Sequence, residues 1–433
     1  MSRWQTTLIA LLACCLLLTA CTTNNTTPAA TSVSDLDAAT DGQVLTVVNK
    51  ETSKDILTTA DPNQKKFQIQ TRLTDFHLIN RITGIAWGIT RGELRMYMTV
   101  DQGQTWTNIS PAAAVQFPTS LNYGKDLVFL DSQHGWVARK PYGNTEGVLL
   151  YTDDGGIHWN LSSMPPVHGD VDIYFQDLQH GWLVSTETED TGYQLKSFYN
   201  TVDGGKTWNT SNEDPLTVRT ELGKQQDVPG RIPTAGYFNG MTFVSNNQGF
   251  VMLQHPNVSA MYTTSNGGQS WHKDNVTFNK SELMDCDQFS AQSPQFFATE
   301  PSTGYMPVKC VKDMRSKFNG LFTSDGGKSF QFSPFALNWK SDENDGIAPV
   351  FLNKQEGWSL QNNAIYHTTD QGKTWSELTV SGDKLQTTLQ DYPQVVKLEF
   401  ISQTVGWILV ENMVKKSSRL LQTTDGGVTW RLL

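Results

Sequence analysis

The sequence is short of charge, of cysteine and of long apolar runs. Only 18% of its 433 residues are charged, and 43 acidic residues against 33 basic ones give a net charge of −10. An acidic chain without basic runs is a poor match for nucleic acid or for an anionic lipid surface, because Lys and Arg supply the affinity for both. We therefore expect no nucleic-acid partner. No apolar run reaches the roughly 20 residues of a membrane-spanning helix.

Aromatic residues and glycine are plentiful instead, with 13 Trp, 20 Phe, 12 Tyr and 34 Gly. Trp, Tyr, Thr and Val suit half-buried strands, and the long runs of Ala, Glu, Lys and Leu that build helices are missing. The composition predicts an all-β protein.

The N-terminus is predicted to be a targeting segment. Residues 8–20 are apolar but too short to span a bilayer, and their length fits a signal-peptide core. The ending Leu18-Thr19-Ala20-Cys21 resembles the bacterial lipobox, which implies a lipoprotein signal peptide over 1–20 and acylation (palmitate) of Cys21. Residues 21–65 are predicted to be a lipidated tether, since Thr, Asn, Ala and Ser dominate its first half. The alternative is a plain secretory signal with a chance cysteine. Either reading places the chain outside the cytoplasm, and the first anchors it to a membrane of the cell envelope through lipid only.

Two cysteines, Cys286 and Cys310, remain outside this segment. An exported chain with two thiols favours a disulfide between them. Two separate buried thiols are the alternative, because a pair of cysteines in a sequence establishes no geometry.

A short motif recurs seven times with the pattern Ser/Thr-x-Asp-x-Gly-x-x-Trp/Phe, known as the Asp-box. Such a period of about 54 residues signals a repeat architecture. We interpret the Asp as the cap of a hairpin turn in which Gly supplies positive φ. The Asp position is occupied by Asp101, Asp154, Asp203, Asn266, Asp325, Asp370 and Asp425.

A second motif recurs with the same period as the Asp-box. Gly followed by an aromatic residue stands before most Asp-boxes, as in Gly135-Trp136 and Gly406-Trp407, and six residues earlier there is usually Phe, as in Phe129 and Phe400. The two motifs predict four strands per repeat, with the Asp-box between the third and fourth. One such sheet cannot bury both faces, so the repeats are predicted to stack as a seven-bladed β-propeller of four-stranded antiparallel blades over 66–433. Residues 44–48 or 67–70 could supply a closing strand.

The combination of Phe-x-Asp-x-x-x-Gly-Trp with a following Asp-box resembles the photosystem II assembly/stability factor family. Phe129-Leu130-Asp131 with Gly135-Trp136 is a close copy. The resemblance covers 74–433 and implies a seven-bladed propeller, often exported as a lipoprotein in bacteria. The photosynthetic members are thought to bind their partner through a basic patch, whereas this chain is acidic and shows no Arg cluster in its repeats. We therefore expect a different partner, an envelope protein or a glycan, and a monomeric chain.

We expect no enzyme, no cofactor and no metal site. The alternative is a glycoside hydrolase of the sialidase or endoglucanase type, since these also carry Asp-boxes. Gly230-Arg231-Ile232-Pro233 looks like the sialidase Arg-Ile-Pro motif, but it follows the third box rather than preceding the first. His134 and His180 stand alone before Gly-Trp, and metal ligands must converge. Asp342, Glu343 and Asp345 could hold Ca²⁺, although a solvated loop is the simpler interpretation.

Binding is expected on the face opposite the Asp-boxes, where the loops vary in length. Variable loops on a rigid scaffold are the usual place for function. The candidate binding residues are Arg219, Arg231, Tyr237, Trp339, Asp391 and Tyr392.

Overall fold

The computed structural model describes residues 43–48, 66–112, 115–117, 119–142, 146–190, 192–211, 229–274, 278, 286–341, 346–379, 381–382 and 384–433. They belong to one compact unit, Asp41–Leu433. The predicted signal peptide and Cys21 lie outside the described residues.

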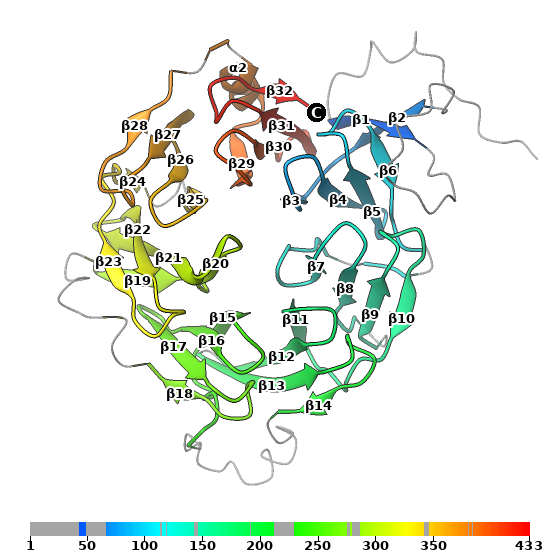
Figure 1. Cartoon of the computed structure of the whole chain (residues 1–433), viewed down its shortest axis with the longest axis vertical. Coiled ribbons are helices and arrows are strands. Elements are labelled where there is room, and N and C mark those ends of the chain that lie inside the picture. Colours follow the sequence, from blue (N-terminus) through cyan, green and yellow to red (C-terminus); the bar gives the residue numbers. More distant parts are fainter. Residues whose placement is uncertain are drawn as a thin grey trace, which may run out of the picture. The chain divides into compact units, whose positions relative to one another are not determined.

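The described residues form seven sheets arranged as the blades of a propeller (Figure 1). Each blade is antiparallel and follows chain order from its innermost to its outermost strand, so the predicted fold class is confirmed. Blade 1 consists of β3 (Asp75–Leu78), β4 (Gly84–Thr90), β5 (Glu93–Thr99) and β6 (Trp106–Asn108). Blade 2 consists of β7 (Leu127–Phe129), β8 (Gly135–Arg139), β9 (Val148–Thr152) and β10 (Asn160–Ser162). Blade 3 consists of β11 (Asp170–Phe175), β12 (Gly181–Asp190), β13 (Tyr193–Thr201) and β14 (Asn209–Thr210).

Blade 5 is the irregular one, because its inner strand is split into β19 and β20 and an extra strand, β24, pairs with β22. Helix α2 (Lys384–Asp391) lies in the connection from blade 6 to blade 7. Blade 4 consists of β15 (Tyr237–Phe243), β16 (Gly249–Gln254), β17 (Ser259–Thr264) and β18 (His272–Lys273), and blade 5 of β19 (Gln288–Ala291), β20 (Gln295–Phe297), β21 (Glu300–Lys312), β22 (Arg315–Thr323), β23 (Gln331–Ser333) and β24 (Lys340–Ser341). Blade 6 consists of β25 (Val350–Phe351), β26 (Gly357–Gln361), β27 (Ala364–Thr368) and β28 (Ser376–Glu377). Blade 7 consists of β29 (Gln394–Phe400), β30 (Gly406–Asn412), β31 (Ser417–Thr423) and β32 (Arg431–Leu432).

The spacing of Phe and Gly-Trp follows from strand pairing. Phe129 of β7 is paired with Gly135 of β8, and its ring lies so close that a Cβ on Gly135 would approach it to 2.7 Å. Phe400 and Gly406 repeat this arrangement with the same 2.7 Å approach. Glycine is required because the ring occupies the place of a side chain.

The tryptophan that follows the glycine joins one blade to the next. Trp136 of blade 2 stacks on Phe175 of blade 3 at 4.0 Å between ring centroids, and its Nε1 donates to the carbonyl of Gly204 in the Asp-box of blade 3 at 3.0 Å. Trp358 makes the same pair of contacts with Phe400 and Gly426 of blade 7. Each unit therefore contributes half of an interface with its neighbour.

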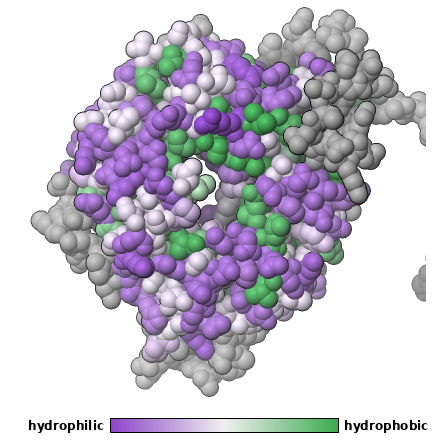
Figure 2. All heavy atoms as spheres, in the orientation of Figure 1, coloured by the Kyte–Doolittle hydropathy of each residue, from purple (hydrophilic) through white to green (hydrophobic). Residues whose placement is uncertain are grey.

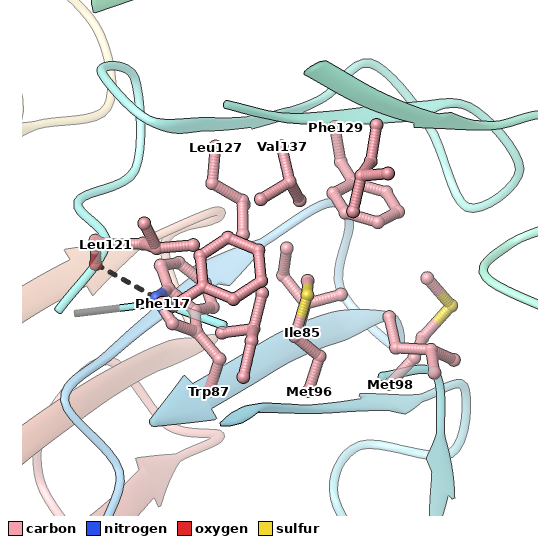
Figure 3. Close-up of a cluster of buried hydrophobic side chains, with 12 residues drawn as sticks. Ile85, Trp87, Met96, Met98, Phe117, Leu121, Leu127, Phe129 and Val137 are labelled. Atoms are coloured by element: carbon pink, nitrogen blue, oxygen red, sulfur yellow. Dashed lines mark hydrogen bonds between the residues drawn. The ribbon is translucent and has the colours of Figure 1, made fainter. Parts of the chain in front are cut away.

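The hydrophobic core is divided among the interfaces between blades. Seven clusters of buried residues are present in the described chain, and each spans two neighbouring blades. Figure 3 shows the cluster between blades 1 and 2, where Trp87 packs on Phe117 and donates from Nε1 to the Leu121 carbonyl at 3.0 Å. This division explains why a single blade could not bury its own faces.

An N-terminal hairpin seals the junction between blades 7 and 1. Strand β1 (Gln43–Val48) pairs in parallel with β6 and in antiparallel with β2 (Lys66–Thr71). Gln43 accepts from the backbone N–H of Leu420 at 2.8 Å and donates to the carbonyl of Leu433, both in blade 7. Leu45 is fully buried in the cluster that joins the two blades. Because β1 lies within 21–65, that segment is not a linker throughout.

Candidate binding face opposite the Asp-box turns

Antiparallel blades give the propeller two different faces. Turns between the first and second strands and the Asp-box turns emerge on one face. Turns between the second and third strands emerge on the other, together with the starts of the inner strands. We call this second face the variable face. Contacts such as that from Gln194 N to the Thr234 carbonyl, at 2.9 Å, tie its turns to the connections between blades.

The Asp-box side chains are fully used inside their own turns. Asp325 accepts from Ser329 N at 3.0 Å, from Ser329 Oγ at 2.6 Å and from Thr323 Oγ1 at 2.8 Å. Burial by itself would raise its pKa, but these hydrogen bonds outweigh burial and hold the pKa of Asp325 at about 2. Asn266 replaces Asp in the fourth box and keeps the bond from Ser270 N at 2.9 Å. The boxes are therefore turn caps, and their carboxylates accept hydrogen bonds within their own turns.

The two His-Gly-Trp sequences are also local turns. His134 Nδ1 lies 2.9 Å from Asp131 Oδ2, and Asp131 Oδ1 accepts from His134 N at 2.8 Å. His180 and Asp177 repeat the geometry. No group of three or more His, Cys, Asp or Glu side chains that could hold a metal ion occurs among the residues that the structure describes.

The disulfide candidates are joined, with Cys286 just before β19 and Cys310 in β21 at 5.3 Å between Cα atoms. The disulfide ties the segment that leads into blade 5 to β21, the long second strand of that blade.

Two of the predicted binding residues, Tyr237 and Tyr392, have structural roles. Tyr237 begins β15, and its hydroxyl accepts from Gly192 N at 2.7 Å. Tyr392 is only 4% exposed and packs in the core of blades 6 and 7 under Arg419, so the prediction that it contacts a ligand is wrong. Asp391 is exposed, and its carbonyl accepts from Asn412 Nδ2 at 2.6 Å.

The remaining candidates lie on separate connections. Arg231 is half-buried between blades 3 and 4. Trp339 is half-buried before β24, with Lys317 Nζ 5.5 Å from its ring centroid. The predicted residues therefore belong to three different interblade connections rather than to one site. Arg219 and the possible Ca²⁺ ligands Asp342, Glu343 and Asp345 lie outside the described residues.

A cluster of charged side chains lies where the inner strands of blades 7 and 1 meet. Lys397 Nζ lies 3.4 Å from Asp75 Oδ1 and 3.3 Å from Glu399 Oε2, and it donates to the Phe76 carbonyl at 2.7 Å. His77 Nδ1 lies 2.9 Å from Glu399 Oε1.

Burial opposes ionisation of this cluster, but its opposite charges outweigh burial. Beside His77 and Lys397, the pKa of Glu399 falls to about 2, and the carboxylates of Glu399 and Asp75 raise the pKa of Lys397. At neutral pH Glu399 is therefore ionised beside Lys397, so its carboxyl cannot donate a proton.

A second polar cluster lies at the start of the inner strands of blades 2 and 3. Lys140 Nζ lies 2.5 Å from Asp170 Oδ1. Burial raises the pKa of Asp172 to about 6, assisted by the carboxylates of Asp126 and Asp170 and opposed by Lys125. Burial also raises the pKa of Asp126. In the sequence, this cluster could have been predicted from charged residues that lie two positions apart on an inner strand, such as Asp170 and Asp172.

The structure also contains a cavity of about 410 Å³ at the inner side of blades 5, 6 and 7. Figure 2 shows apolar residues gathered around the central opening. The lining residues are Ser290, Gln292, Gln295, Pro307, Lys309, Phe318, Gly346, Ile347, Ala348, Pro349, Val350, Val396, Lys397 and Leu398. Its lining charges are both positive, in contrast to the acidic cluster on blades 2 and 3.

Comparison with known proteins gives the context of this fold. The BNR/Asp-box repeat family matches residues 366–377. The photosystem II assembly lipoprotein Ycf48 of Synechococcus sp. (strain CC9902) is 26% identical over 168 residues, which are 37% of this chain and only 39% of that protein.

Two solved structures match most of this chain. YCF48 from Cyanidioschyzon merolae is 16% identical, with a TM-score of 0.48 and coverage of 81% of this chain and 95% of that chain. A PL25 ulvan lyase is 9% identical, with a TM-score of 0.50 and coverage of 83% and 96%. At 9% identity the likeness to the ulvan lyase concerns the fold alone. The chain is an Asp-box (BNR) repeat β-propeller that resembles the Ycf48 assembly factors.

Proposed function

We propose that this protein is a non-catalytic scaffold, held at the extracytoplasmic side of the cell envelope by lipid on Cys21, which binds an envelope protein through its variable face. The similarity to an assembly lipoprotein supports this role. No helix in the described parts of the chain is long and apolar enough to cross a membrane.

The observation that carries the proposal is the state of the inner-strand carboxylates of blades 7 and 1. Asp75 and Glu399 share Lys397, and the pKa of Glu399 is about 2. A glycosidase requires one carboxylic acid that remains protonated until it donates to the leaving group. The ion-paired Glu399 cannot supply it, whereas charges of both signs at the edge of the variable face, such as Asp170 and Lys140, suit the recognition of a protein.

A second function, glycoside hydrolysis, is favoured by one specific observation. Asp126 and Asp172 lie at the start of neighbouring inner strands, and burial raises the pKa of both carboxyls. A carboxyl of raised pKa is what a general acid requires. The Asp126 carboxylate, however, already accepts from Asn122 N at 2.9 Å.

Purification of crosslinked partners from membranes tests the proposed function. The partner recovered with the wild-type chain should be lost with Asp170→Lys, which reverses charge on the variable face. It should be retained with Asp153→Lys, an exposed Asp in the second Asp-box. Cys21→Ser should reduce recovery by releasing the chain from the membrane.

Turnover of envelope glycans by the purified chain, abolished by Asp172→Asn, would favour the hydrolase instead. Retention of the same partner by Asp170→Lys would contradict the assignment to the variable face.

A further inference from the structure

Two turns of the variable face end in apolar side chains that are almost completely exposed. Met314, between β21 and β22 of blade 5, is 84% exposed, and Val414, between β30 and β31 of blade 7, is 94% exposed beside Met413 at 61%. In the described Asp-box turns, the most exposed large apolar side chain is that of Val202, at 55%. Transfer of these side chains to an apolar environment would remove most of their surface from water, which is favourable.

The backbone holds these side chains at the apex of tight turns. Asp313 and Met314 have φ of 49° and 56°, and Lys416 has φ of 51°, a conformation that residues other than glycine rarely adopt. Asn412 Oδ1 accepts from Lys415 N at 2.8 Å and closes the blade 7 turn. The apolar apices are therefore presented on rigid hairpins rather than on loose loops.

Exposed charged residues flank both apices. Asp313 and Arg315 stand on either side of Met314, so the blade 5 turn carries both signs, whereas Lys415 and Lys416 follow Val414. The blade 7 turn is thus locally cationic, although the whole chain carries a net charge of −10. An apolar apex with cations behind it matches the boundary of an anionic bilayer, where apolar atoms enter the acyl region and Lys or Arg meet the phosphates.

The separation of the apices favours a bilayer over a protein partner. They lie on blades 5 and 7, and the corresponding turn of blade 6 consists of polar Asn362 and Asn363. A stable protein interface buries about 800 Å² per partner around a continuous apolar centre, which separated apices do not form. A bilayer accepts separated apices that emerge on the same face. Tyr142, 65% exposed at the blade 2 turn, is also of a type enriched at membrane interfaces.

We propose that the turns of blades 5 and 7 dock the variable face on an anionic lipid surface, with Met314, Met413 and Val414 inserted below the headgroups. The contact goes beyond the proposed scaffold function, because it orients the propeller on the membrane and does not depend on the acyl chain. A membrane partner would then meet the rim of the same face.

A fluorescent probe of insertion tests the contact directly. The chain is produced from Thr22 onward, which removes Cys21 and retains the compact unit Asp41–Leu433. Because Cys286 and Cys310 are bonded to each other, Val414→Cys provides a single thiol for an environment-sensitive dye. Vesicles of phosphatidylcholine with phosphatidylglycerol should increase the emission roughly threefold and shift it to the blue, as expected for transfer to an apolar environment. The same dye on Val100→Cys, in the first Asp-box, should not respond.

Paired substitutions give the matching binding measurement. Met314→Asp with Val414→Asp should lower the vesicle-bound fraction roughly tenfold in sedimentation, because charged groups cannot enter the acyl region. Val100→Asp with Val202→Asp adds the same charge on the opposite face and should leave binding unchanged. An equal loss in both pairs, or equal dye responses at 414 and 100, would overturn the proposal. So would a dye at 414 that ignores vesicles but responds to an added partner protein. None of these outcomes depends on whether a partner is recovered from membranes.

Discussion

The ring of Trp182 in blade 3 lies flat on the ring of Phe243 in blade 4, with centroids 3.6 Å apart and planes 8° from parallel. Trp182 Nε1 also donates to the Gly267 carbonyl of the blade 4 Asp-box at 2.9 Å. One side chain therefore connects the two repeated motifs across an interface, which accounts for their common period.

Trp182→Ala should destabilise the propeller by about 3–5 kcal/mol, since it empties a buried aromatic site and leaves the Gly267 carbonyl without its donor. Denaturant unfolding measures the change. Trp339→Ala is the matched control, because that ring is only half-buried, and it should cost much less. Equal losses in the two variants would contradict the assigned role of Trp182.

Asp325→Ala should cost about 1 kcal/mol, because it removes the acceptor for Ser329 N and for two hydroxyl groups. Asp325→Asn should cost less than half as much, as Asn266 already caps the equivalent turn. Thermal unfolding of the two variants provides the comparison. If Asn proved as damaging as Ala, a role for the negative charge itself would be indicated.

Glu399 should make stability depend on acid pH. Its folded-state pKa, about 2, lies below the ordinary 4.5 because the opposite charges of His77 and Lys397 outweigh burial. A depressed carboxyl pKa stabilises the fold above pH 4.5, and the contribution, up to about 3 kcal/mol, is lost as the pH falls from 4.5 towards 2. Unfolding measured across this range should show the loss in the wild type and a flatter profile in Glu399→Gln. An unchanged profile in the variant would refute the assignment.

Asp172 should make stability depend on pH in the direction opposite to that of Glu399. Its folded-state pKa, about 6, lies above the ordinary 3.8 because of burial, so folding becomes less favourable as the pH rises from 3.8 through 6. Asp172→Asn should therefore stabilise the chain at pH 7 by about 1 kcal/mol and have little effect near pH 4. Asp170→Asn is the control, because Asp170 is exposed and paired with Lys140. Destabilisation by Asp172→Asn at pH 7 would show that the carboxylate has a partner of its own.

Leu45→Ala should cost about 2–4 kcal/mol, because Leu45 is fully buried at the junction of blades 7 and 1. Val44→Ala, on the half-buried side of the same strand, should cost well under half of that. Denaturant unfolding separates the two. A negligible effect of Leu45→Ala would mean that β1 contributes nothing to closure of the ring.

The number of blades and the role of the Asp-box were readable from the sequence because both depend on short-range contacts. Asp101 bonds to Thr99 and Thr105, and Phe129 pairs with Gly135 six residues away. Interactions of this range repeat wherever the motif repeats. The binding candidates were less successful, since Tyr392 has a residue type common at interfaces but its burial is set by packing against α2 and blade 7.

The sequence by itself therefore determined the repeating unit. This unit is a four-stranded sheet with a capped Asp-box turn, a Phe ring packed against a Gly, and a Trp that packs on the next blade. Tertiary structure decided what closing the ring brings together. Asp75 and Lys397 lie far apart in the sequence, in the first and seventh blades, and they meet only because the seventh blade returns to the first. No local sequence pattern around either residue indicates that the two are in contact. Only the closed ring shows which charged side chains are buried, which of them are paired, and which apolar turns remain exposed.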